Sequence, residues 1–157
     1  MKEDKPNLKE LYKKFQNKLP KFEILDEEFE LSSVSIKDDT FLIRTIRRRV
    51  NEKVVFYCRI IEGLLYPNTN NFMGMLELKS FDDDEKNKMF ELYKKLMLYE
   101  RQSLILDVNP TEKGDFNYIN ELWKNWSNFK KELIKITEKM KTSWHEKDEK
   151  IKDNYFG

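Results

Sequence analysis

Six cations and a single anion lie between residues 41 and 60, interleaved with Ile, Val, Phe and Tyr. Arginine and lysine pair with phosphates, and an aromatic ring beside them can stack on an unpaired base. The whole chain has a formal net charge of only +1, so any attraction for nucleic acid must be local. The segment therefore predicts a surface for single-stranded nucleic acid, with the following contact residues: Arg44, Arg48, Lys53, Tyr57 and Arg59.

The same segment has two other interpretations. Its β-branched and aromatic residues favour a hairpin that turns at Asn51-Glu52, which places Arg44 opposite Arg59 and calls for a counter-charge. The run of three arginines at 47–49 is also typical of a solvated sheet edge that resists aggregation. An acidic protein partner would suit these cations too. A slip of one residue in the hairpin would exchange its two faces.

The remaining polar residues do not form a catalytic or metal-binding pattern. The acidic run 82–85 lacks the spacing and the glycine of a calcium loop, and it suits the positive end of a helix instead. The single Cys58 excludes an internal disulfide and a Cys-rich zinc site, and the single His145 argues against a multi-histidine centre. There is no glycine-rich phosphate loop. We expect no enzymatic activity, no cofactor and no metal.

Periodicity and capping residues predict the elements that carry these groups. Asn7 and Glu10 have the spacing of a capping box at the start of a helix. Alternating and β-rich segments follow, and helical spacing returns after the acidic run. The prediction is an α+β fold with an N-terminal helix over 7–19, a small antiparallel sheet of three or four strands (22–34, a hairpin over 40–62, and 72–78), and two longer helices over 82–102 and 116–144.

The last predicted helix carries apolar residues with unbroken three-four spacing, which defines a heptad seam. Such a stripe must be covered, either by the rest of the domain or by a second chain, because bundle helices use the same spacing. Trp123 and Trp144 widen it, which favours a homo-oligomer or, as the alternative function, a protein-interaction or chaperone-like module that uses this aromatic face. The oligomerisation residues are Ile119, Leu122, Trp126, Phe129, Leu133, Ile136 and Met140.

Length and composition indicate one domain over residues 1–144, followed by a charged tail over 145–157 that we expect to fray. A hydrophobic content of 39% is enough for a folded core. No apolar run approaches the roughly 20 residues that span a bilayer, and the first ten residues are too charged for a secretion signal. We therefore expect a cytoplasmic protein without a membrane partner.

The order of these parts resembles the ThermoDBP family of archaeal single-stranded DNA-binding proteins and their relatives. The resemblance covers residues 7–144, and the segments that carry it are Phe41–Ile61 and Ile119–Met140. It implies a compact α/β domain with a basic and apolar cleft, helical association into oligomers, and sequence-tolerant binding of single strands through Arg44, Arg48, Tyr57 and Arg59. We thus predict a non-catalytic single-stranded DNA-binding protein.

Overall fold

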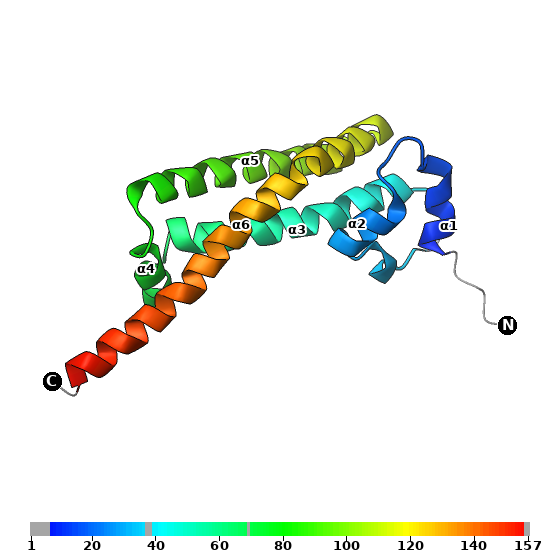
Figure 1. Cartoon of the computed structure of the whole chain (residues 1–157). Helices are drawn as coiled ribbons and strands as arrows, with labels where there is room; N and C mark the ends of the chain where they lie inside the picture. Colours follow the sequence, from blue (N-terminus) through cyan, green and yellow to red (C-terminus); the bar gives the residue numbers. More distant parts are fainter. Residues whose placement is uncertain (1–6, 37–38, 69, 156–157) are drawn as a thin grey trace. The chain divides into compact units, whose positions relative to one another are not determined.

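The computed structural model of the chain is helical in each regular element that it describes (Figure 1). It describes the backbone of residues 7–36, 39–68 and 70–155, with side chains as far as His145. No strand occurs within these residues, so the predicted α+β fold and its sheet are wrong. The chain divides into two compact units, unit 1 with residues Met1–Val55 and Leu98–Asn125, and unit 2 with residues Phe56–Met97 and Trp126–Gly157.

The predicted hairpin is the helix α3, Leu42–Leu65. Its β-branched residues suggested strands, but its buried positions recur every three or four residues, which is the period of a helix and not of a strand. The polar break at Asn51-Glu52 is a turn of this helix and leaves it continuous. The most deeply buried residues of α3 are Leu42, Ile46, Arg47, Val50, Val54, Ile61 and Leu64.

The other predicted strands are helices as well. The segment 22–34 contains α2, Phe22–Phe29, whose buried residues Phe22, Leu25 and Phe29 share one helical face. Glu30 ends α2 in the left-handed conformation with φ 54°, and a 3-10 helix, Leu31–Ser33, follows. The predicted fourth strand is α4, Phe72–Leu78. The short length and local alternation of these two segments suggested strands, but their burial against neighbouring helices determines a helical conformation.

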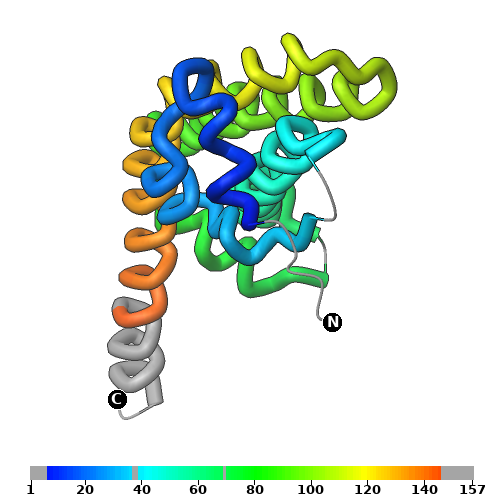
Figure 2. The backbone as a smooth tube through the Cα atoms, turned by 90° about the vertical axis from the view of Figure 1, so that its right-hand side faces the viewer, coloured from blue at the N-terminus to red at the C-terminus, as the bar shows by residue number. Residues whose placement is uncertain are grey.

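Unit 1 opens with α1, Leu8–Tyr12, which continues into a 3-10 helix, Lys13–Phe15, and is shorter than the helix predicted over 7–19. The side chain of Asn7 caps α1 by accepting a hydrogen bond from the Lys9 amide at 3.0 Å. The Tyr12 hydroxyl donates to the Pro20 carbonyl at 2.5 Å, and its ring meets Phe22 edge-on at 5.3 Å. These contacts hold α1 beside α2, as the blue end of the chain in Figure 2 shows.

Two long helices complete the chain. The helix α5, Asp83–Val108, extends beyond the predicted end near residue 102, and α6, Glu112–Tyr155, includes the predicted helix over 116–144. The backbone of the predicted tail is helical as far as Tyr155, and residues 156 and 157 lie outside the described part. In unit 2, the rings of Tyr57 and Trp126 stack at 4.8 Å and tie α3 to α6.

The start of α5 confirms the interpretation of the acidic run as a helix N-terminus. The Asp82 carboxylate accepts a hydrogen bond from the Glu85 amide at 2.8 Å, and the Glu85 carboxylate accepts one from the Asp82 amide at 2.9 Å. This reciprocal pair is a capping box, and it satisfies two amides that the helix cannot pair internally.

Loss of this cap should destabilise unit 2. We expect Asp82→Ala to lower the free energy of unfolding by about 1 kcal/mol, because the Glu85 amide loses its acceptor. Asp83→Ala, which removes a neighbouring carboxylate from the first turn without touching the box, is the matched control. Urea denaturation of both variants checks this, and equal losses would show that the box contributes nothing beyond the charge of the first turn.

Candidate functional site

The five residues predicted to contact nucleic acid are divided between the two units. Arg44, Arg48 and Lys53 belong to unit 1, whereas Tyr57 and Arg59 belong to unit 2. Tyr57 is buried in its stack with Trp126, so its ring faces are not open to a base. Arg59 is exposed. The hairpin face that was expected to assemble these side chains is absent, since the segment is the helix α3.

The predicted cations of unit 1 have partners within that unit. Arg48 donates to the Asp107 carboxylate at 2.9 Å, and Lys53 donates to the Glu28 carbonyl at 2.6 Å. The Arg44 guanidinium lies over the Phe41 ring, 4.8 Å from its centre. Much of the local positive charge is therefore engaged inside the fold.

The most deeply held cation is Arg47, which is 0% exposed. Its Nε donates to Asp115 at 2.7 Å and its Nη2 to Asp107 at 2.5 Å, while Nη1 donates to the hydroxyl and the carbonyl of Ser103 at 2.5 and 3.2 Å. The cluster joins α3, α5 and α6 within unit 1. A buried charge with this many partners positions helices, and no side of it is open to a ligand.

Arg49 completes the set of engaged arginines. Its Nη1 lies 2.5 Å from the Glu52 carboxylate, its Nη2 lies 3.1 Å from that of Glu30, and its Nε donates to the Phe29 carbonyl at 3.0 Å. The run 47–49 is thus not a sheet edge, since the segment is helical. It connects α3 to α2, α5 and α6 in unit 1.

The heptad seam of α6 is covered within the single chain. Of the seven residues predicted for oligomerisation, six are buried and the seventh, Met140, is partly buried. The structure therefore corresponds to the alternative in which the stripe packs on its own chain, and a homo-oligomer stays a prediction. The buried members are Ile119, Leu122, Trp126, Phe129, Leu133 and Ile136.

The tryptophans proposed as an aromatic binding face are also engaged. Trp126 is 2% exposed, and the ring of Trp123 meets Phe29 edge-on at 6.3 Å in unit 1. In unit 2, Trp144 Nε1 donates to the Glu77 carboxylate of α4 at 2.6 Å. The aromatic face of α6 is accordingly not the place where this protein offers a free apolar surface.

A free apolar surface lies instead at α4 in unit 2, where Phe72, Met73 and Met75 of the helix and Tyr66, which follows α3, are exposed; we call these four residues the α4 surface. Phe72 is 65% and Met73 57% exposed. Figure 1 shows α4 beside the C-terminal end of α3. This short helix has its large apolar side chains on the solvent side, the reverse of the usual amphipathic arrangement.

The backbone of α4 explains this reversal. Gly74 is buried, and a Cβ atom at this position would lie 2.9 Å from the Gly63 carbonyl oxygen of α3 and 2.9 Å from Nδ2 of Asn71. The Asn71 side chain caps α4 by accepting from the Gly74 amide at 3.0 Å. Because α4 meets α3 through glycine, it needs no large side chain on its inner face, and its position is fixed closely.

Sequence reasoning missed the α4 surface, although a signal was present. The 14 residues from 63 to 76 carry no charged side chain, in a chain in which 38% of residues are charged. Their asparagines and Pro67 suggested a loop and their apolar residues a strand. The absence of charge over such a length was the feature that pointed to a surface of distinct chemistry.

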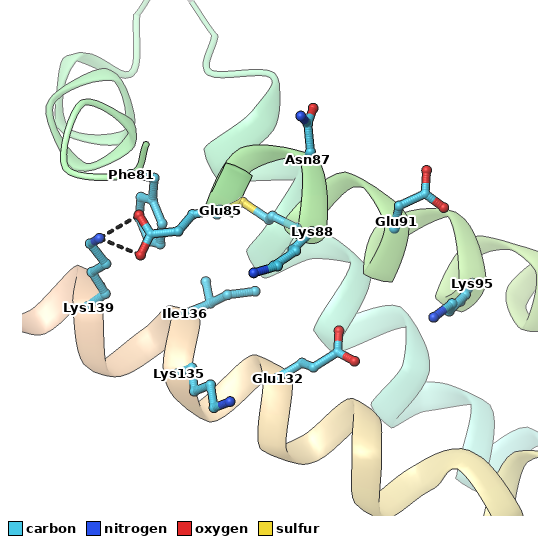
Figure 3. Close-up of a pocket in the computed structure, with 11 residues that line it drawn as sticks. Phe81, Glu85, Asn87, Lys88, Glu91, Lys95, Glu132, Lys135, Ile136 and Lys139 are labelled. Carbon is cyan, nitrogen blue, oxygen red and sulfur yellow. Dashed lines mark hydrogen bonds and ion pairs between the residues drawn. The ribbon is translucent and has the colours of Figure 1, made fainter. Parts of the chain in front are cut away.

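Unit 2 also contains an open groove of about 630 Å³ between α5 and α6 (Figure 3). Phe81, Met89 and Ile136 line its base, but each is at most 9% exposed. Lysines and glutamates of both helices form the rim, and Lys139 bridges Glu85 at 2.5 and 2.6 Å. Charges of both signs at its edge distinguish this groove from the uncharged residues exposed on α4.

The described residues hold no metal-binding arrangement. No group of three or more His, Cys, Asp or Glu side chains in this part of the chain is placed to hold a metal ion. Cys58 is buried on α3, and His145 is exposed near the end of the described side chains. None of the described helices is both long and apolar enough to cross a bilayer.

Comparison with known proteins gives no relative: no protein-family model, no curated protein and no solved structure matches this chain. The resemblance to the ThermoDBP family stays a prediction, while the α/β domain that it implies is not the fold observed.

The arginine cluster makes the stability of unit 1 sensitive to acid. The hydrogen bond from Arg47 lowers the pKa of Asp107 from its ordinary value of 3.8; burial opposes this shift, and a second bond from Arg48 adds to it. A carboxyl group whose pKa is depressed by folding stabilises the fold above its unfolded pKa, and this contribution is lost as the pH falls through its folded pKa.

We therefore expect the wild-type free energy of unfolding to fall below about pH 5, and Asp107→Asn to show a shallower fall over the same range, because that variant has lost one titrating group. Urea denaturation at a series of pH values measures both slopes. Asp83→Asn, on the exposed first turn of α5, serves as the control. Parallel profiles for the wild type and Asp107→Asn would contradict the assignment.

Proposed function

We propose that this protein is a non-catalytic protein-interaction module that binds an apolar, uncharged segment of a partner protein on the α4 surface. The observation that carries the proposal is the exposure of Phe72 and Met73 on a helix whose backbone is packed closely against α3. Large apolar side chains held outward in this way favour burial against a partner, since each such side chain releases hydration water on contact.

The composition of the α4 surface suits this role. Aromatic residues and methionine are enriched at protein interfaces, and lysine and glutamate are depleted there. Methionine adapts to a partner of irregular shape, whereas the aromatic rings supply rigid contact area. Because residues 63–76 carry no charge, a partner segment that was itself charged would lose hydration without gaining an ion pair.

Single-stranded nucleic acid, the partner expected from the sequence, stays an untested prediction. A phosphate backbone calls for several free cations side by side. The α4 surface has none, and the arginines at 47–49 are engaged with carboxylates and carbonyls of unit 1. These observations favour a protein partner over a polynucleotide.

Site-specific photo-crosslinking in the cells that produce the protein tests the proposal. We expect p-benzoylphenylalanine at position 72 to give discrete adducts with a partner protein, and the same group at position 56 to give few. Phe56 is a suitable control because it is 56% exposed and also lies in unit 2, on α3. Equal yields at the two positions, or none at position 72, would contradict the α4 surface.

Measuring the affinity for the partner identified in this way shows how much the α4 surface contributes to binding. Phe72→Ser combined with Met73→Ser should weaken binding at least about tenfold, because two apolar side chains no longer leave water on association. Phe56→Ser should bind like the wild type. Salt-sensitive binding of a labelled single-stranded oligonucleotide that is lost in Arg59→Ala would instead favour the nucleic-acid hypothesis.

A further inference from the structure

A second apolar stripe lies on the part of α5 that belongs to unit 1, residues 98–108. Leu98, Arg101, Ile105 and Val108 follow one another at spacings of three, four and three, the same spacing as the seam of α6. Unlike that seam, this stripe is open to solvent: Leu98 is 72%, Ile105 57% and Val108 87% exposed. We call these four residues the α5 seam.

The opposite side of this helix packs against the rest of unit 1. Ser103 and Leu106 are buried there, and Asp107 is held by Arg47 and Arg48. Rotation of the helix to bury the α5 seam would therefore break the arginine cluster. The seam stays outward, and its spacing is that of a helix prepared to pack against another helix.

We propose that the α5 seam binds the same seam of a second copy of this chain, with the two helices antiparallel. In that register Leu98 faces Val108 of the second copy, and Arg101 faces Ile105 of the second copy. Both pairs are symmetric about residue 103, so a single two-fold axis brings the whole seam into contact with itself. Such an isologous contact closes on two copies and does not propagate. It uses a different surface from α4, so it is independent of the proposed function.

The charges of the seam favour a second copy in this orientation. A parallel pair would place Arg101 beside Arg101 of the second copy in the same layer, which is repulsive. The antiparallel pair sets Arg101 against Ile105, where its aliphatic stem packs while its guanidinium keeps its ion pair with Glu100 of the same chain, at 3.0 Å. The residues that flank the seam, Gln102, Leu104 and Asn109, carry no charge. A different protein that recognised this helix through ion pairs beside the seam would therefore have no charged side chain to bind there.

The size of the seam sets the expected strength. Its 11 residues span about 16 Å of helix, so the contact between two copies is smaller than a standard specific interface. We therefore expect a reversible dimer whose dissociation constant is on the order of micromolar or weaker. Arg101 limits the affinity, because it occupies a position that an apolar side chain would fill better.

Sedimentation equilibrium of the full chain over a range of concentrations tests the proposal. We expect a monomer–dimer equilibrium for the wild type, at least about tenfold tighter association for Arg101→Leu, and loss of the dimer for Ile105→Glu. Ile134→Glu, the same change at an exposed isoleucine of unit 2, is the control and should associate like the wild type. A tighter equilibrium in Arg101→Leu that stops at two copies distinguishes the seam from aggregation of a misfolded chain.

Cysteine crosslinking determines the orientation. In a Cys58→Ser background, the double variant Leu98→Cys with Val108→Cys should form an intermolecular disulfide under mild oxidation, and Leu98→Cys alone should not. Ready crosslinking of Leu98→Cys alone would indicate parallel helices and overturn the proposed register. A chain that stays monomeric up to about 1 mM, or a dimer that Ile105→Glu and Arg101→Leu leave unchanged, would overturn the proposal itself.

Discussion

The buried guanidinium of Arg47 is the interaction on which the helical arrangement of unit 1 depends. A cation removed from water is tolerated only where its charge is balanced and its N–H groups are bonded. Asp115 supplies this from α6, and Asp107 and Ser103 supply it from α5. These bonds fix the rotation of α3, since a turn of the helix about its axis would carry the charge away from its carboxylates. The same bonds hold the outward side of α5 toward solvent.

Local features could be predicted from the sequence, and features that depend on distant partners could not. The helix start at the acidic run 82–85 and the helical spacing of α6 were predicted correctly because each is defined by neighbours within one or two turns. The segment 42–65 was not, because its Ile, Val, Phe and Tyr residues favour strands, whereas its buried positions follow the three-four spacing of a helix. Arg47 was interpreted as a surface cation, because its partner Asp115 is distant in the sequence and no local pattern indicates that the two are in contact.

Spacing identified an apolar stripe but did not say what covers it. The seam of α6, expected to face another chain, is buried within its own, whereas the α5 seam and the α4 surface are exposed. At α4 the cause is steric: Gly74 lies so close to the Gly63 carbonyl oxygen of α3 that this side of α4 has no room for a side chain. At α5 the seam is exposed for an electrostatic reason, because the opposite face of the helix must place Asp107 in contact with Arg47. Exposure thus follows from constraints on the other side of each helix.

A double-mutant cycle on Arg47 and Asp115, read out as the free energy of unfolding in urea, tests this account most directly. We expect Arg47→Met and Asp115→Asn each to cost about 3–5 kcal/mol, since each leaves a buried group without its partner. The double variant should cost clearly less than the two together, with a coupling of at least about 2 kcal/mol. Single losses below about 1 kcal/mol with no coupling, as measured for exposed ion pairs, would contradict the buried cluster and the arrangement of helices built around it.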